Sequence, residues 1–492
     1  MSPAEPGSLR GSAVRGVKWT SLAMVAVTIL GLAQLAILTR LLSTSDFGLM
    51  SMIATVVGFA QVYADMGFSN AIIYRQDADS DQLSSLYWAN IIVSVALGAV
   101  LVAVAPLVAA FFHEPSLVQP LRLVCLTFVI TPLGQQFEVL LQRELEFGLL
   151  ARRDIAAAAA GLIVAVATAA AGQGVYALVW GQLAQASVRA VTTAALGWRR
   201  WRPRLHLRWH DLHGFISFGL YQVGERSIYY WAANVDYLLI GRYLGPSQLG
   251  VYTIAYNLVV LPLAKLNPVL TKVAFPVFAR KQDDPTALRR GFGELIELVA
   301  FVTFPLLIGL GVTAPVAVPV IFGPGWESAA VLVQIMVVMG LLKCLSNPFG
   351  SILLAKGRAD VGFWLNVVST AVTVVALWLV VDYGTSAVAW GHTLVNVASF
   401  VVELVVLRRI IGMGMGAYFS RLARTVLATA VMGVGVAGIY LLLRKRGLDM
   451  TLELAVLVAA GVALYVLTWM AVARAYVLGL WRLLVKRSPE PA

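Results

Sequence analysis

Long apolar segments separated by short polar ones recur along the whole chain. Most are about 20 residues or longer, the length that an α-helix needs to cross a hydrocarbon core of about 30 Å. The segments lack a strand-like alternation, and turn-forming stretches such as STSD, HEPS and FGPGW separate them. We therefore expect an all-α protein with about fourteen membrane spans. The predicted spans are 17–42, 47–70, 84–112, 117–142, 155–173, 174–196, 214–242, 248–275, 291–313, 327–354, 360–382, 385–408, 421–443 and 451–478.

Composition supports a membrane location for these helices. The 492 residues are 60% hydrophobic and 13% charged, with a mean hydropathy of +0.82. About 25% of the residues of a soluble domain are charged, so this chain has too few polar residues to cover a water-facing surface. We expect a polytopic protein that contacts the lipid bilayer. The net charge of +12 is then explained by basic loops, and no nucleic-acid partner is expected.

The distribution of lysine and arginine predicts the topology. If the N-terminal segment 1–16 is cytoplasmic, most of the loop cations also fall on the cytoplasmic side. Both termini, including the tail 481–492, are therefore expected inside. The triplet Arg444–Lys445–Arg446 is the exception. The first apolar segment is too long for a signal peptide and is expected to be an uncleaved span.

The connection 197–213 is basic and rich in tryptophan, with WRRWRPRLHLRWH at its centre. Tryptophan favours the membrane–water interface, and arginine favours anionic headgroups. Two interpretations remain open. The segment is either a topology signal alone or an interfacial segment that recruits an anionic lipid or a lipid-linked substrate.

Short motifs that recur in order indicate an internal duplication. RLLSTSDFG matches RYLGPSQLG about two hundred residues later, so Arg40 and Gly48 correspond to Arg242 and Gly250. Each copy holds six spans, an even number, which predicts two parallel six-helix lobes of a transporter that admits its substrate between them. The repeated motif is then the first hairpin of each lobe, with a structural role near the outer interface. The lobes are expected at 17–196 and 214–410, joined by the basic linker 197–213 and followed by two extra helices within 411–480.

The sequence contains no catalytic motif that we can identify. H-E-x-x-H, G-x-S-x-G and phosphate-binding-loop patterns do not occur, and the outer loops are short. Cys125 and Cys344 lie inside apolar segments, which argues against a disulfide framework or a cysteine metal site. We expect a protein that is not an enzyme, with no metal and no cofactor. A membrane glycosyl-transfer enzyme is the alternative from a different class.

Cations inside the spans are the candidate substrate ligands. A charge at the centre of a span costs roughly 2.5–3.5 kcal/mol on insertion scales, so it usually faces a polar cavity. Arg226, Lys265 and Lys343 lie near mid-depth and are candidates to bind an anionic substrate, since arginine suits phosphate oxygens. Tyr230 and Tyr237 share a helical stripe with Arg226 and are candidates to line the same cavity.

Carboxylates inside the spans leave a further choice open. Asp65, Glu225 and Asp236 are candidates to bind or relay a coupling cation, H⁺ or Na⁺. The alternative is structural pairing, for example of Arg226 with Glu225 or Asp236. Glu138 lies nearer the cytoplasmic end of its span, where its carboxylate is expected to reach the interface.

Several stretches together resemble a known family. LLSTSDFGLMSMIATVVGFAQVYADMGFSNAIIYRQD resembles the N-terminal signature of polysaccharide exporters of the multidrug/oligosaccharidyl-lipid/polysaccharide flippase superfamily, of the colanic-acid-exporter type. FFHEPSLVQPLRL, LLQRELEFGLLARRDI and IFGPGWESAAVLVQIM are similar to that family in order and spacing. The resemblance covers nearly the whole chain.

The resemblance implies a function. Members of this family carry an undecaprenyl-diphosphate-linked oligosaccharide from the cytoplasmic to the periplasmic leaflet of the bacterial inner membrane. The resemblance implies that Arg226, Lys265 and Lys343 bind the diphosphate of this cargo. It also implies that Tyr230 and Tyr237 contact its sugars. The product could be exopolysaccharide, capsule or lipopolysaccharide, and a polysaccharide polymerase or export complex is the expected protein partner. A cation-coupled exporter of drugs or metabolites on the same fold is the nearest alternative. A lipid scramblase or structural partner of an assembly complex is another.

Overall fold

The structure is a computed structural model that describes residues 6–64, 72, 79–281 and 283–485. Throughout these residues the regular secondary structure is helical. Ten of the described helices are long and apolar enough to cross a membrane. The prediction of an all-α polytopic membrane protein is therefore confirmed. The chain divides into two compact units, Met1–Gly250 and Val251–Ala492.

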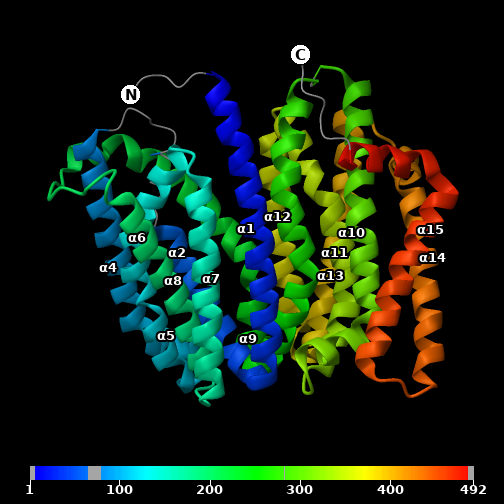
Figure 1. Cartoon of the computed structure of the whole chain (residues 1–492), viewed down its shortest axis with the longest axis horizontal. Helices are drawn as coiled ribbons and strands as arrows, with labels where there is room; N and C mark the ends of the chain where they lie inside the picture. The colour runs from blue at the N-terminus through cyan, green and yellow to red at the C-terminus, as the bar shows by residue number, and fades with distance from the viewer. Residues whose placement is uncertain (1–5, 65–71, 73–78, 282, 486–492) are drawn as a thin grey trace. The chain divides into compact units, whose positions relative to one another are not determined.

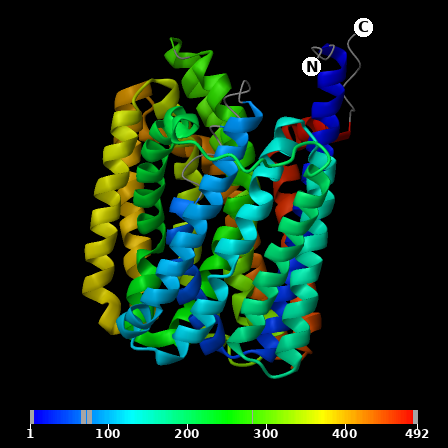
Figure 2. The ribbon, with the colours of Figure 1, turned by 90° about the vertical axis from the view of Figure 1, so that its left-hand side faces the viewer.

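The first unit is a bundle in which α8 packs against both α6 and α7, α1 lies along α7, and α4 packs against α6 (Figures 1 and 2). The Asp79 side chain caps the start of α4 by accepting from the Gln82 N–H, and His113 ends the helix in the left-handed conformation. The predicted span 117–142 is broken by a turn between α5 and α6. The helices of the unit are α1 (Pro6–Leu41), α2 (Thr44–Ala64), α4 (Ser80–Phe112), η1 (Pro115–Leu117), α5 (Val118–Val124), α6 (Thr127–Arg143), α7 (Phe147–Ala170), α8 (Val175–Gly197) and the first part of α9 (Trp209–Ala279).

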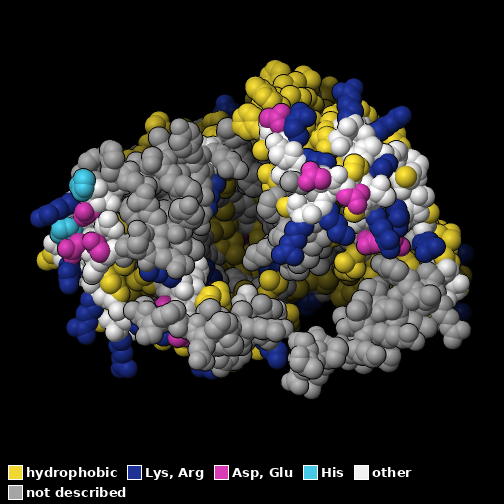
Figure 3. All heavy atoms as spheres, turned by 90° about the horizontal axis from the view of Figure 1, so that it is seen from above, with side chains coloured by type: hydrophobic (Ala, Val, Ile, Leu, Met, Phe, Trp, Pro, Cys, Tyr) yellow, Lys and Arg dark blue, Asp and Glu magenta, His cyan; other side chains and the backbone are white. Residues whose placement is uncertain are grey.

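In the second unit α10 is the central helix, in contact with α11, α14 and α15. The predicted extra helices, α14 and α15, pack on α10 through an apolar cluster that includes Met432 and Trp469. Seen from the end at which α4 and α10 begin, each unit carries lysine and arginine side chains at its surface (Figure 3). The remaining helices are the end of α9, α10 (Pro285–Phe322), α11 (Glu327–Ala355), α12 (Ala359–Val380), η2 (Val381–Tyr383), α13 (Thr385–Ile411), α14 (Met415–Arg444) and α15 (Met450–Val485).

Helix α9 joins the seventh and eighth predicted spans across a kink. Gly245 has φ 79° and ψ 178°, a conformation outside the helical region. A side chain at this φ would be strained, which explains a glycine at this position. The first copy of the motif has Ser43 there instead. Pro246 follows and restarts the helix without needing a backbone donor. The first part of α9 packs with the first unit, whereas the predicted lobe boundary in 197–213 remains a prediction.

The repeated hairpins contact each other reciprocally within the first unit. A Cβ atom on Gly48 would overlap the Pro246 carbonyl oxygen, and a Cβ on Gly250 would overlap the Thr44 carbonyl oxygen. Because Thr44 and Pro246 are themselves equivalent in the repeat, the two contacts are related by local pseudo-twofold symmetry. The Thr44 and Ser247 hydroxyls add a 2.7 Å hydrogen bond between the hairpins.

Arg40 and Arg242, the cations of the repeated motif, lie in different surroundings. The Arg242 guanidinium donates to the Phe111 carbonyl oxygen and lies 4.8 Å from the centre of the Phe111 ring. It thereby ties α9 to the end of α4. Arg40 is exposed in the last turn of α1. The structural role predicted for the motif remains a prediction, and these contacts support it.

We expect Gly48→Ala and Gly250→Ala each to lower the free energy of unfolding by about 2 kcal/mol, because the added methyl group must displace a backbone carbonyl. Gly31→Ala is the control, since no atom lies within 4 Å of its added Cβ. There the usual gain in helix propensity should leave stability unchanged or raised. Thermal unfolding of the purified protein in detergent measures the difference. Equal melting temperatures for Gly48→Ala and Gly31→Ala would contradict the expected clash.

Candidate functional site

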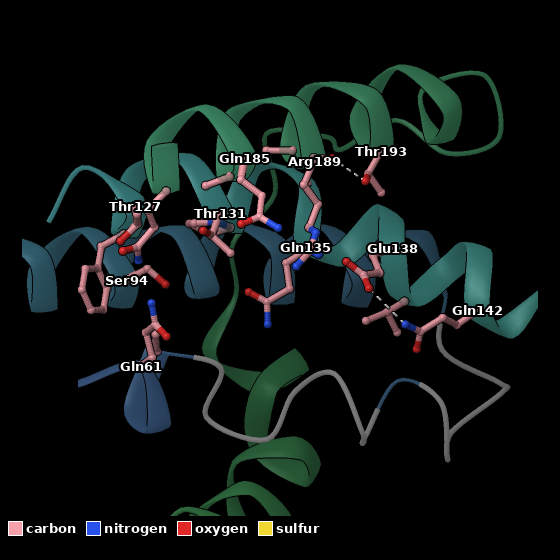
Figure 4. A pocket seen from close by; sticks show the side chains of 18 residues that line it. Gln61, Ser94, Thr127, Thr131, Gln135, Glu138, Gln142, Gln185, Arg189 and Thr193 are labelled. Carbon is pink, nitrogen blue, oxygen red and sulfur yellow. Dashed lines mark hydrogen bonds between the residues drawn. The ribbon is translucent and has the colours of Figure 1, made fainter. Parts of the chain in front are cut away.

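A polar pocket of about 550 Å³ lies inside the first unit, among α2, α4, α6 and α8 (Figure 4). Its polar lining consists mainly of amides and hydroxyls, with one carboxylate and one guanidinium. The polar residues are Gln61, Ser94, Thr127, Thr131, Gln135, Glu138, Gln142, Gln182, Gln185, Arg189 and Thr193. Burying so many polar groups in a membrane bundle is costly, so the pocket is a candidate site for a hydrophilic ligand.

Two facing helices supply most of this lining. The contributing residues of each helix are three or four apart, which places them on one face. Helices α6 and α8 approach closely at Gly134, where an added Cβ would lie 2.6 Å from the Ala190 Cα. The stripes are Thr131, Gln135, Glu138 and Gln142 on α6, and Gln182, Gln185, Arg189 and Thr193 on α8.

One end of the pocket carries charge. Arg153 of α7 is only 3% exposed at its side chain and forms ion pairs with Glu138 at 2.7 Å and Asp154 at 2.8 Å. It also donates to the Thr193 hydroxyl at 3.1 Å. Arg189 is 44% exposed and has one longer ion pair, 3.3 Å to Asp154. The two cations balance the two carboxylates, so this end is polar but formally neutral.

The opposite end of the pocket is uncharged. Gln61 and Ser94 lie at that end, away from Glu138 and Arg189 (Figure 4). An amide group both donates and accepts hydrogen bonds, and so does a hydroxyl group. Such a lining suits a neutral, polyhydroxylated ligand. Within the described part of the chain, no cluster of metal-ligating side chains is found.

Tyr230, one of the predicted sugar contacts, lies in a smaller pocket of about 190 Å³ in the same unit. This pocket is mostly apolar and is bounded by Phe59, Leu101 and Trp231. The Tyr230 hydroxyl donates to the Thr55 carbonyl oxygen at 2.9 Å, so it ties α9 to α2. Sugar binding by Tyr230 and Tyr237 remains a prediction, and Tyr237 is half-buried on α9.

Lys343 belongs to a cluster of aromatic side chains in the second unit. Its ammonium group donates to the Tyr256 hydroxyl at 3.1 Å and lies 5.2 Å from the centre of that ring. The Tyr256 ring stacks on the His392 ring at 6.1 Å and on the Tyr252 ring at 6.0 Å. This arrangement holds a cation against π faces and thereby lowers the cost of its burial.

The remaining predicted ligands are dispersed along α9. Arg226 is exposed in the first unit, and Lys265 is half-buried in the second. Whether Arg226, Lys265 and Lys343 bind one diphosphate therefore remains a prediction. Asp236 is buried, and its carboxylate accepts from the Tyr237 N–H.

The alternative role for these charges is ion pairing of Arg226 with Glu225 or Asp236. Arg226 and Asp236 are separated by about 15 Å along the helix axis, which argues against their direct pairing. Asp65 lies outside the described residues, and so does the Glu225 side chain. The coupling-ion prediction for these carboxylates stays open.

Sequence reasoning missed the polar pocket because it searched for isolated charges. The signal was present in TPLGQQFEVLLQ and GQLAQASVRAVT, where polar residues recur at helical spacing within apolar spans. The Glu138 carboxylate is expected to reach the membrane interface, but its surroundings in the structure include more than that. Its carboxylate pairs with the buried Arg153 and also lines the pocket.

Comparisons with known proteins agree with this architecture. Residues 37–331 match the family described as "Polysaccharide biosynthesis protein". The chain is 34% identical to the teichuronic acid biosynthesis protein TuaB of Bacillus subtilis, over 93% of this chain and 95% of that protein. It is also 34% identical to the lipopolysaccharide biosynthesis protein WzxC of Escherichia coli, over 79% of this chain and 78% of that protein.

Solved structures show a similar fold. The lipid II flippase MurJ in an inward closed conformation matches with a TM-score of 0.72 and 12% identity, over 93% of this chain and 99% of MurJ. An inward-facing multidrug MATE transporter matches with a TM-score of 0.61 and 16% identity, over 81% of this chain and 98% of the transporter. At such identities the likeness concerns the fold.

We expect Arg153→Met to lower the free energy of unfolding by about 3–5 kcal/mol, because it leaves two carboxylates without their buried partner. Arg189→Met removes the same charge from a partly exposed position on the same network and should cost about 1 kcal/mol or less. Thermal unfolding of both variants in detergent tests the contrast. Equal losses of stability would show that Arg153 does not stabilise the charged end of the pocket.

Proposed function

The chain belongs to the polysaccharide biosynthesis protein family, and from this premise we propose that it flips a lipid-linked oligosaccharide across a bacterial membrane. The cargo is an undecaprenyl-diphosphate-linked repeat unit, moved from the cytoplasmic to the periplasmic leaflet of the inner membrane. The two relatives named above are proteins of teichuronic acid and lipopolysaccharide biosynthesis. The fold is also that of a lipid II flippase and of MATE transporters, which supports a transport role by alternating access.

The observation that carries the proposal is the polar pocket inside a helical membrane bundle. Its volume of about 550 Å³ falls within the usual range of small-molecule sites, about 300–1,000 Å³. Its amides and hydroxyls offer hydrogen bonds to sugar hydroxyls without a surplus of charge. We assign the sugar part of the cargo to this pocket.

The diphosphate and the lipid tail require other surroundings. Arg226, Lys265 and Lys343 remain our candidates for the diphosphate, because a guanidinium or ammonium group in a low-dielectric environment attracts phosphate oxygens. The lipid tail would stay in the bilayer during transfer. A coupling cation, H⁺ or Na⁺, is assigned to Asp236 and to the other predicted carboxylates.

Topology and partners form part of the same proposal. The asymmetry of loop cations places both termini in the cytoplasm. A polysaccharide polymerase or export complex would then receive the cargo on the periplasmic side. The product is exopolysaccharide, capsule or lipopolysaccharide.

The alternatives fit the observations less well. A drug exporter of this fold would be expected to present aromatic and acidic groups to an apolar cation, whereas the larger pocket presents glutamines and hydroxyls. A glycosyl-transfer enzyme would need a catalytic constellation, and the lining combines one carboxylate with amides that are poor acids and bases. The family assignment also favours transport or assembly over catalysis.

The leaflet position of the cargo tests the proposal directly. In a strain that lacks the protein and any redundant flippase, the labelled lipid-linked unit should accumulate complete and facing the cytoplasm. Restoring the gene should relieve the accumulation. Complete units that reach the periplasmic face and stay unpolymerised would overturn the proposal and favour a role in polymerisation or assembly.

Replacing Gln135 and Gln185 together by leucine should lower the flipping rate about 10- to 30-fold, because two hydrogen bonds of about 1 kcal/mol each are lost. The control is Gln173→Leu, at an exposed position between α7 and α8. Protein levels and melting temperatures are compared first. Wild-type flipping by a normally folded double variant would exclude the polar pocket as the sugar site.

A further inference from the structure

The linker between α8 and α9 is a fixed strap, which we define as residues Trp198–Arg208. It is not helical, yet its backbone is hydrogen-bonded to the first turns of α4. The Trp88 indole donates to the Arg204 carbonyl oxygen at 2.8 Å. The Arg204 and Arg208 N–H groups donate to the Ser84 and Ser85 hydroxyls at 3.1 Å each. The strap crosses the outer face of the first unit (Figure 2).

Side chains reinforce this attachment. The Trp201 ring contacts the rings of Tyr87 at 5.8 Å and Phe137 at 5.6 Å. Just beyond the strap, Asp211 accepts hydrogen bonds from Ser85 at 2.7 Å and from His206 at 3.0 Å. The hydrogen bond from Ser85, followed by that from His206, outweighs desolvation and lowers the pKa of the Asp211 carboxyl.

The strap exposes large apolar side chains as well as arginines. Leu205 is 95% exposed, Leu207 is 50% exposed and Trp198 is 48% exposed. Leu205 lies in a tight turn, which is closed by the His206 N–H donating to the Arg204 carbonyl oxygen at 2.8 Å. The two leucines stand two residues apart, and between them the His206 side chain is directed to Asp211. Two exposed leucines this close together are unfavourable in water and favour an apolar or interfacial environment.

Four of the five arginines of the strap fall into two groups. Arg200 forms ion pairs with Glu144 and, at 2.8 Å, with Glu146. Arg204 pairs with Asp81 at 2.9 Å. Arg199 and Arg202 are exposed and form no salt bridge with any residue that the structure describes. Their charges remain available to an anion outside the protein.

The depth of the strap favours lipid over a cytosolic partner. Trp88 is the ninth residue of α4, which is about 12 Å along the helix from its start. The predicted span begins at residue 84, so the strap lies beside the N-terminal turns of a membrane helix. At this depth leucine meets the boundary of the acyl chains, and arginine meets phospholipid headgroups.

We propose that the strap is a docking site for anionic phospholipids of the adjacent leaflet. Leu205 and Leu207 enter the headgroup–acyl boundary, while Arg199 and Arg202 bind the headgroup phosphates. The site is separate from the polar pocket and does not depend on the transport proposal. Its occupant is a lipid of the surrounding membrane, rather than the transported one.

A fluorophore on Leu205→Cys provides the test. The native cysteines, Cys125 and Cys344, are both buried, which limits background labelling. The labelled full-length protein in detergent is titrated with short-chain phosphatidylglycerol or with phosphatidylcholine of the same chain length. Phosphatidylglycerol should give a saturable blue shift at concentrations well below those needed for phosphatidylcholine. Leu207→Cys repeats the measurement at the neighbouring leucine.

Charge removal gives the matched comparison. Each arginine near an anionic surface contributes about 5-fold in affinity, so Arg199→Gln with Arg202→Gln should weaken phosphatidylglycerol binding about 25-fold. The control, Arg444→Gln with Lys445→Gln, removes the same charge from another exposed segment and should leave binding unchanged. An equal response to both lipids, or an unaltered response in the Arg199/Arg202 variant, would overturn the proposal.

Two further measurements exclude the other occupants. In phosphatidylglycerol nanodiscs the label at 205 should be shielded from aqueous iodide, unlike a label on the exposed Asp283→Cys. Equal quenching at the two sites would show that the strap faces water or a soluble partner. Full displacement of phosphatidylglycerol by inorganic pyrophosphate would assign the arginines to a diphosphate instead. Either result refutes phospholipid docking.

Discussion

The whole molecule depends on satisfying polar groups where no water is available to do so. In a hydrocarbon environment all backbone groups must bond to one another, which restricts a spanning chain to helices or closed barrels, and this chain forms helices. The same constraint acts on side chains. Arg153 is acceptable inside the first unit because two carboxylates and a threonine hydroxyl surround it. The polar pocket concentrates further polar groups in the same bundle. Its amides and hydroxyls suit a ligand that forms hydrogen bonds with them.

The fold class could be predicted from the sequence because hydropathy and turn chemistry act locally. The predicted spans coincide with helical structure in the described chain, apart from the turn inside 117–142 and short turns at span ends. The repeated motif contains the glycines that the hairpin contact needs. The pocket was harder to predict, since it depends on which face α6 turns toward α8. A glutamine inside a span is uncharged, so a search for buried charges does not detect it. The glutamines of α6 indicate a pocket only because the polar stripe of α8 faces them.

The two compact units differ in the chemistry of their interiors. In the first unit the interior is lined by amides and an ion-pair network around Arg153. In the second, Lys343 rests against Tyr256, which stacks in turn on His392. The first unit therefore presents mainly uncharged hydrogen-bonding groups, and the second holds a cation against aromatic faces. The cargo that we propose combines sugars with phosphate and would require both kinds of environment.

The reciprocal hairpin contact also bears on how the family can evolve. It is made by glycines against backbone carbonyl oxygens, and main-chain atoms are the same whatever the surrounding side chains. Substitutions around the pocket can accumulate without altering this join, provided that the glycines stay. If the pocket binds the glycan as we propose, exchanges among its glutamines would change the glycan while this backbone contact is kept. Members that carry different cargoes could then share the same hairpin contact.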